Sequence, residues 1–155
     1  MCDDIHMWKD IDASDVANSI KDFLNKYFAG CYIDEGIDIP DMYAHVSPYY
    51  LALCMRIIFR FDPSSKLLCI CNCAKGGQLI LRFSLSTAKL SRSSILQLRS
   101  AAKRGCFSVS INDNKIEMIC NLYSKNNLNT NTEKTPIVYN VLCSVFEMFD
   151  YLKID

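Results

Sequence analysis

The sequence lacks a long apolar run. Its most apolar stretch, Leu51–Phe61, is interrupted by two arginines, whereas a membrane-spanning helix needs about 20 consecutive apolar residues. The N-terminus carries Asp3 and Asp4 and has no cationic segment before an apolar run, so we expect no secretory signal. No internal repeat divides the 155 residues, and this length fits one domain. The sequence therefore predicts a single soluble domain over 1–155, with no membrane partner.

The chain also lacks the pattern of a disulfide scaffold, although it has nine cysteines. Their number is odd and most of them lie inside apolar runs. Secreted disulfide scaffolds are usually smaller, loop-rich and evenly numbered, whereas a free cysteine behaves as a small buried hydrophobe. We therefore expect reduced thiols and a cytoplasmic location.

Patterns for metal binding and for common catalytic sites are missing. Cys69, Cys71 and Cys73 alternate along an expected strand and share one face, but a zinc site typically uses paired Cys-x-x-Cys units or nearby histidines. His6 and His45 are the only histidines and stand in no acid–base pattern. No serine occupies a Gly-x-Ser-x-Gly turn. We therefore predict no metal site and no catalytic residue, and we favour a protein that is not an enzyme.

The net charge is zero, but the charges are unevenly distributed. Residues 1–48 carry ten acidic and three basic side chains, whereas 49–112 carry ten basic side chains and one acid, Asp62. A basic surface of this kind can bind nucleic acid or an acidic partner. We favour the alternative that the acidic third packs against the basic middle and neutralises it, since dedicated nucleic-acid binders are usually basic overall.

Four helices are predicted from apolar residues at helical spacing and from capping residues, over 14–28, 48–61, 91–104 and about 135–151. Ser47-Pro48 is a strong start signal, because serine accepts backbone amides and proline gives up an amide that would be unpaired anyway. Ser14 is the expected N-cap of the first helix, and Gly105 the expected end of the third. The last helix is so apolar that it either caps the core or leaves a stripe for a second subunit in a homodimer.

Hairpins and an extended segment complete the order of elements. Apolar residues alternate over 67–73 and 78–86 around a double glycine, and again over 106–111 and 115–123 around a polar turn. The segment 31–39 is expected to be extended, and so is the segment from Tyr43 to Val46 that contains His45. Hairpins that alternate with helices imply an α/β (α+β) two-layer sandwich, in which helices cover a mixed, mainly antiparallel sheet.

This order resembles the ATP-binding domain of sensor histidine kinases, the GHKL or Bergerat fold, over residues 13–123. The segment Ala44–Ile70 is similar to the family's buried N-box helix and the strand after it, and Gly77–Ser84 to the strands that lead to the adenine-binding Asp-x-Gly-x-Gly motif. The resemblance implies a bacterial-type signalling context. It also implies that a nucleotide pocket, where retained, is lined by Arg56, Ile57, Arg60, Ser84 and Ser86.

The residues that hold ATP in that family are missing. Arg56 is followed by Ile57, Ile58 and Phe59 where the N-box asparagine would bind magnesium, a cation that requires oxygen ligands. The strand that should end in an aspartate ends in serine, and 87–104 lacks the glycines of an ATP lid. We therefore predict a degenerate, non-catalytic domain that needs no cofactor and serves as a protein-interaction or signalling module. The first alternative is a domain that binds ATP or ADP, with or without Mg²⁺, through altered ligands.

The second alternative is nucleic-acid binding through the basic helix at 89–104. This helix carries five basic residues and no acid, but no aromatic residue stands among them to stack on single-stranded bases. Nucleic acid is therefore the least favoured partner. The basic residues either remain solvated over an apolar stripe or form an interaction face, which consists of Lys89, Arg92, Arg99, Lys103 and Arg104.

Overall fold

The computed structural model describes residues 8–36, 38–72, 77–86, 90–124 and 137–150. Their strands are β1 Lys9–Asp12, β2 Tyr32–Ile33, β3 Met42–Val46, β4 Lys66–Asn72, β5 Gln78–Ser84, β6 Ser108–Asn112 and β7 Lys115–Ser124. The strands form one sheet in the order β1-β3-β7-β5-β4-β2, and β6 joins it by pairing with β7. Among these strands only β2 and β4 pair in parallel, so the sheet is mixed and mainly antiparallel.

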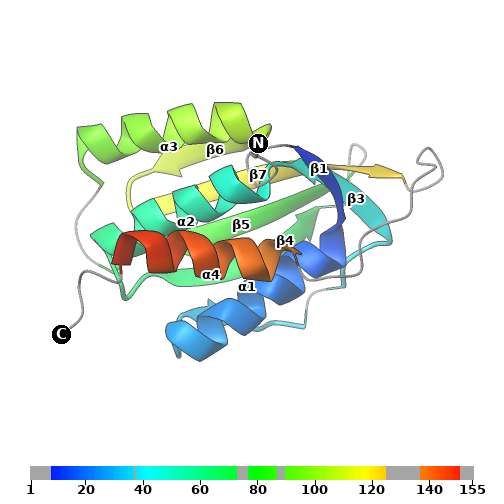
Figure 1. Ribbon diagram of the computed structural model, residues 1–155, viewed down its shortest axis with the longest axis horizontal. Helices are drawn as coiled ribbons and strands as arrows, with labels where there is room; N and C mark the ends of the chain where they lie inside the picture. Colours follow the sequence, from blue (N-terminus) through cyan, green and yellow to red (C-terminus); the bar gives the residue numbers. More distant parts are fainter. Residues whose placement is uncertain (1–7, 37, 73–76, 87–89, 125–136, 151–155) are drawn as a thin grey trace.

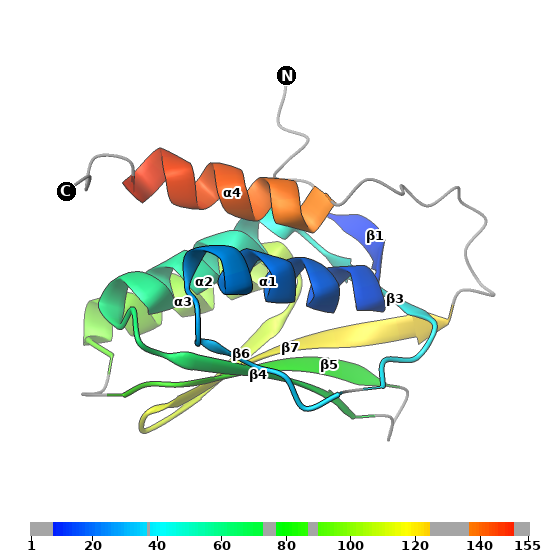
Figure 2. The same cartoon turned by 90° about the horizontal axis from the view of Figure 1, so that it is seen from below.

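The helices cover one face of this sheet (Figures 1 and 2). Helix α2, Pro48–Phe61, lies between α1, Ala13–Tyr27, and α3, Arg92–Gly105 (Figure 1). Helix α4, Ile137–Asp150, packs on the outer side of α1 and α2 (Figure 2). The predicted α+β architecture of helices over a mainly antiparallel sheet is confirmed. Because α4 covers α1 and α2, the outer side of α3 stays open.

Helix α2 has the range that its start signal predicted. The side-chain oxygen of Ser47 accepts a hydrogen bond from the backbone N–H of Tyr50, and Pro48 occupies the first turn. Leu51, Met55 and Ile58 are fully buried. The helix ends at Phe61, and Asp62 is its C-cap residue.

The start of α1 differs from the prediction. The N-cap is Asp12 rather than Ser14, and the Asp12 Oδ1 accepts the Ser14 backbone N–H at 3.0 Å. Aspartate caps as well as serine does, and pairing of β1 with β3 extends the preceding residues up to Asp12. The helix therefore begins as soon as that strand ends.

β1 was not predicted, whereas β3 contains the segment around His45 that was expected to be extended. β1 and β3 pair with each other, and β3 continues the sheet by pairing with the end of β7. β1 has a single apolar residue, Ile11, among charged ones, so its alternation is weak in the sequence. Of the extended segment 31–39, only Tyr32–Ile33 joins the sheet, by pairing with β4. These pairings join segments that lie far apart in the sequence, which local patterns do not reveal.

Helix α3 ends one residue later than predicted, with Cys106 rather than Gly105 in the left-handed conformation, at φ 69°. Gly105 serves a different purpose. A Cβ atom at this position would lie 2.5 Å from the Phe107 ring and 2.8 Å from the Tyr50 Cβ. The backbone oxygen of Gly105 also accepts a hydrogen bond from the Ser47 N–H at 3.1 Å. The glycine is required here because α2 and the end of α3 come too close for a side chain.

The apolar stripe of α4 caps the core of this same chain. Val138, Val141, Leu142 and Val145 are at most 5% exposed, and the Phe146 ring centroid lies 4.8 Å from that of Phe23 on α1. Of the two interpretations of this helix, core capping accounts for these residues. A homodimer stays a prediction. The predicted beginning of the helix at 135–136, its end at 151 and the loop 125–134 lie outside the described residues.

The seven described cysteines form no disulfide. Burial raises the pKa of the Cys69 thiol to about 11 and that of the Cys120 thiol to about 12. These thiols are therefore protonated and poorly reactive at neutral pH. No three His, Cys, Asp or Glu side chains of the described part of the chain are grouped to hold a metal, although Cys73 and His6 lie outside that part. None of the described helices has the length and apolar character that crossing a membrane requires.

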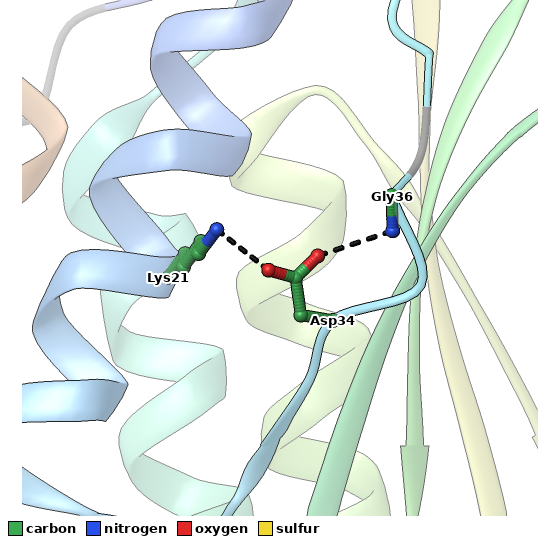
Figure 3. Close-up of polar contacts among 3 residues, drawn as sticks. All are labelled: Lys21, Asp34 and Gly36. Carbon is green, nitrogen blue, oxygen red and sulfur yellow. Dashed lines mark hydrogen bonds and ion pairs between the residues drawn. The ribbon is translucent and has the colours of Figure 1, made fainter.

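A surface contact fixes the loop after β2 to α1 (Figure 3). Lys21 Nζ lies 2.7 Å from Asp34 Oδ2, and the Gly36 backbone N–H donates to Asp34 Oδ1 at 3.1 Å. The hydrogen bond from Lys21, then that from Gly36, lowers the pKa of the Asp34 carboxyl below its usual value. Both charged side chains are exposed, so the pair contributes little stability.

Asp34→Asn should lower the melting temperature slightly at neutral pH and not at all in strong acid. Because the folded-state pKa of Asp34 is lowered, its contribution is present above the unfolded pKa of about 3.9 and is lost as the pH falls through the folded value. Thermal melts of both proteins from pH 7 to pH 2 check this. A difference that persists at pH 2 contradicts the assignment to this carboxylate.

Gly105→Ala should destabilise the fold by about 1–3 kcal/mol, because the added methyl group overpacks against Phe107 and Tyr50. Ordinary helix propensity alone would give a gain of up to about 1 kcal/mol for the same change. Urea denaturation measures the difference, with Ser93→Ala on the exposed part of α3 as the control. Unchanged or increased stability of Gly105→Ala would show that the close approach is wrong.

Candidate functional site

A groove runs between α2 and α3 on the side that α4 leaves open. It contains a cavity of about 510 Å³ and, beside it, a second cavity of about 430 Å³. Arg56, Ile57, Arg60 and Gln97 line both cavities. The two cavities therefore form one continuous site with a shared wall, which we call the α2–α3 groove.

One face of α2 forms the first wall of the groove. Leu53, Arg56, Ile57 and Arg60 follow each other at the spacing of a single helical face. The opposite face of α2 points into the core, where the Phe59 and Phe83 ring centroids lie 5.9 Å apart. The two arginines therefore stand on the part of α2 that neither the sheet nor α4 covers.

The facing wall comes from α3, where Gln97, Ser100, Ala101 and Arg104 have the same spacing. Small residues on this face let the two helices approach. Ala101 is buried, and the Cys54 thiol of α2 lies 3.8 Å from the Leu98 carbonyl oxygen. The Trp8 indole donates a hydrogen bond to the Arg104 carbonyl oxygen at 2.7 Å, which fixes the last turn of α3 to the segment before β1.

The groove is positively charged. Arg56 is 5% exposed, whereas Arg60 and Arg104 are exposed at its rim. None of the described residues that line the two cavities is acidic. Its other polar groups are the hydroxyls of Tyr50, Ser94 and Ser100 and the amide of Gln97. The arrangement of guanidinium, hydroxyl and amide groups suits an anionic ligand with several acceptor oxygens.

The predicted basic face is divided by the structure. Arg104 lines the groove, while Arg92, Arg99 and Lys103 lie on an adjoining exposed stripe of α3, at helical spacing from one another. Lys89 lies outside the described residues. The stripe enlarges the positive surface next to the groove but does not line the cavities.

Among the described residues, no acid of the N-terminal third forms an ion pair with α3, so the predicted neutralisation of the basic middle is not found there. Asp34 pairs with Lys21, and Asp10 lies 2.9 Å from His45, so these two acids are matched within their own third of the chain. Arg60, Arg92, Arg99, Lys103 and Arg104 form no ion pair within the described ranges. Within the described residues, the charges of Arg60 and Arg104 at the groove rim and of the stripe beside it are therefore not neutralised by an ion pair.

The residues proposed for a vestigial nucleotide pocket lie in two places. Arg56, Ile57 and Arg60 line the groove, but Ser84 and Ser86 line neither of its two cavities. The Ser86 backbone N–H instead donates to Asp62 Oδ2 at 2.6 Å, and its hydroxyl donates to the same buried carboxylate. Ser86 thus fastens the end of β5 to the end of α2.

Several groove residues were missed from the sequence. Gln97 and Ser100 look like ordinary solvated positions of a basic helix, and Ser94 like part of its first turn. Their spacing relative to Arg104 was visible in the sequence, but which face of α3 meets α2 was not. The missed residues are Tyr50, Leu53, Ser94, Leu96, Gln97, Ser100 and Ala101.

No protein-family model matches the chain, and no curated protein sequence matches it. Among solved structures, it is similar to the Acinetobacter baumannii histidine kinase AdeS, at 14% identity and a TM-score of 0.44. The similarity covers 77% of this chain and 68% of that one. A similarity of this strength says nothing about the residues of the groove or about activity.

Asp62→Ala should destabilise the protein by about 1–3 kcal/mol, since it removes a buried acceptor and leaves the Ser86 and Ser64 backbone N–H groups without it. Denaturant unfolding measures the loss. Ser64→Ala is the matched control, because its backbone N–H still reaches Asp62. Equal effects of the two substitutions would show that the hydrogen bonds between Ser86 and the Asp62 carboxylate do not stabilise the fold.

Proposed function

We propose that this chain is a non-catalytic, degenerate histidine-kinase-like domain that acts as a protein-interaction module in signalling. Its α2–α3 groove receives an acidic segment of a protein partner. The observation that carries this proposal is that Arg60 and Arg104 are exposed on facing helices along cavities whose described lining includes no acidic residue.

A protein segment fits the groove better than a duplex does. The walls include Leu53, Ile57 and Leu96, and the Leu96 side chain is 63% exposed. Apolar side chains next to an acidic residue can pack on these walls, whereas the phosphate backbone of a nucleic acid offers no such contact. The exposed aromatic residues Trp8, Tyr27 and Tyr123 do not line the groove, and the two aromatic residues that do, Tyr50 and Phe61, are partly buried.

Nucleotide binding through altered ligands is the second candidate, and Gln97 favours it. Its amide oxygen is a group in the groove that can coordinate Mg²⁺. The acidic ligands that usually accompany such an amide are missing from both linings. Without acidic ligands, the arginines would hold the phosphates but the cation would be bound only weakly. Nucleotide binding is therefore the second candidate.

Binding of an acidic peptide should depend on the groove arginines and not on the neighbouring stripe. The probe is a fluorescent ten-residue peptide of alternating glutamate and leucine, measured by anisotropy at low salt. Arg60→Glu or Arg104→Glu should weaken peptide binding about tenfold or more, because each substitution reverses a charge that can contact the peptide directly. Arg92→Glu and Arg99→Glu make the same change in net charge outside the groove and should weaken it about threefold at most.

Equal losses for the two sets of variants would show that binding is unspecific attraction to a basic helix. Tighter binding of a single-stranded or duplex oligonucleotide than of the peptide, lost in the same groove variants, would favour the nucleic-acid alternative instead.

Thermal shift with ATP or ADP, with and without Mg²⁺, tests the second candidate. A nucleotide at 100 times its dissociation constant should add about 2.7 kcal/mol of stability. We expect no shift at millimolar nucleotide. A shift that disappears in Gln97→Ala but survives in Ser93→Ala would establish nucleotide binding in this groove.

A further inference from the structure

We infer that the α2–α3 groove binds an amphipathic helix of the protein partner, and that this helix carries an acidic residue at each end of its apolar face. The inference rests on the proposed function and adds the conformation of the partner segment and the spacing of its acidic residues. Helix α2 forms two grooves with its neighbours, and what fills one of them indicates what the other accepts.

The groove between α1 and α2 is filled by a helix of this chain. Helix α4 packs on both of them (Figure 2), and the Phe146 ring centroid lies 4.8 Å from that of Phe23 and 5.6 Å from that of Phe28. The buried residues of α4 recur at the spacing of one helical face. They are Val138, Val141, Leu142, Val145 and Phe146. Two neighbouring helices of this layer therefore accept the apolar face of a third.

The α2–α3 groove has two helical walls as well, but no helix in the described part of the chain lies in it. Its middle is apolar. Leu53 and Ile57 of α2 are half-buried, and the Leu96 side chain of α3 is 63% exposed. Covering these side chains removes apolar surface from water, and a partner helix does so by laying its apolar face into the groove.

The exposed charges stand at the two ends of the groove. The Ser47 N–H before α2 donates to the Gly105 carbonyl oxygen at the end of α3, so the two helices run antiparallel. Arg104 therefore lies near the start of α2. Arg60, near the end of α2, lines the second cavity together with Ser94 from the first turn of α3. Acidic residues of a partner helix can form charge-assisted hydrogen bonds at both ends.

The distance between these ends sets the spacing of the acidic residues. A Cβ atom at Gly105 would lie 2.8 Å from the Tyr50 Cβ, which places Tyr50 beside the end of α3. Tyr50 and Arg60 are ten residues apart on α2, which corresponds to about 15 Å along the helix axis. Three turns of a partner helix span about 16 Å. Acidic residues at positions i and i+11 therefore match the ends, and apolar residues at i+4 and i+7 match the middle.

The test compares three helical peptides of equal net charge on the full chain, by fluorescence anisotropy at low salt. The matched peptide has glutamate at i and i+11 and leucine at i+4 and i+7, in a background of alanine and glutamine. The displaced peptide has its two glutamates at i+2 and i+9, on the opposite face of the same helix. The proline peptide is the matched peptide with proline at i+6, which breaks the helix. We expect the matched peptide to bind about tenfold or more tightly than either of the others.

Charge exchange tests whether the glutamates meet the groove arginines. Arg60→Glu should weaken the matched peptide about tenfold, and a lysine in place of the glutamate at i or i+11 should restore the affinity to within about threefold. A peptide of the same net charge with that lysine at i+2 or i+9 should not restore it, because the lysine then points away from the groove.

Leu96→Gln tests the apolar contact. It should weaken the matched peptide about fivefold or more, because it removes the exposed apolar side chain on which the leucines of the partner pack. Ser93→Gln is the matched control on the exposed part of α3 outside the groove, and it should change the affinity about twofold at most.

Each outcome supports or overturns the inference. A matched peptide that binds no more tightly than the displaced or the proline peptide overturns the partner helix and leaves the acidic-segment function standing. Restoration by lysine at i+2 or i+9 does the same. Binding neither of these peptides nor of the alternating glutamate–leucine peptide overturns both. Self-association of the chain in sedimentation, abolished by Leu96→Gln, would assign the groove to a second copy and also overturn both.

Discussion

The burial of α2 is the constraint on which the rest of the structure depends. This helix lies between α1 and α3, under α4, and against the sheet. Phe59 contacts Phe83 of β5 and Phe28 after α1, with ring centroids 5.9 and 4.9 Å apart. Leu51, Cys54, Met55 and Ile58 have no exposed surface. A helix that is apolar nearly all round is stable only when other elements surround it, and here those elements are the whole fold.

The same constraint produces the groove. With three sides of α2 occupied, its arginines stand on the side that faces α3 and solvent. Arg56 and Arg60 keep their charge there without entering the core, and small residues of α3 allow the close approach that makes the walls. Gly105 and Ala101 set this distance from one side and Tyr50 from the other. The site is thus a consequence of how one buried helix is packed, and not of a loop inserted for the purpose.

The predictions from sequence succeeded where a signal was local and strong. The range of α2 followed from Ser47-Pro48, and the β4–β5 hairpin followed from alternation around a turn. They failed where pairing partners are distant. β1 was missed because its pairing partner, β3, lies about 30 residues further along the chain, and Ser14 was taken as a cap because the strand that ends at Asp12 was unknown. Of the residues proposed for a nucleotide pocket, Arg56, Ile57 and Arg60 line the groove, whereas Ser86 binds Asp62, a contact that no local pattern reveals.

The sequence by itself determined the class of the protein: an α+β chain with a buried central helix, free core cysteines and a basic middle region without a magnesium-binding asparagine or aspartate on that helix. These properties follow from residue types and their spacing, which act over a few residues along the chain. Only the tertiary structure decided which face of α3 meets α2, which arginines line a cavity, and that Asp34 and Asp10 lie beside Lys21 and His45. Such matters depend on the distance between side chains far apart in the sequence, and that distance is set when the whole core packs.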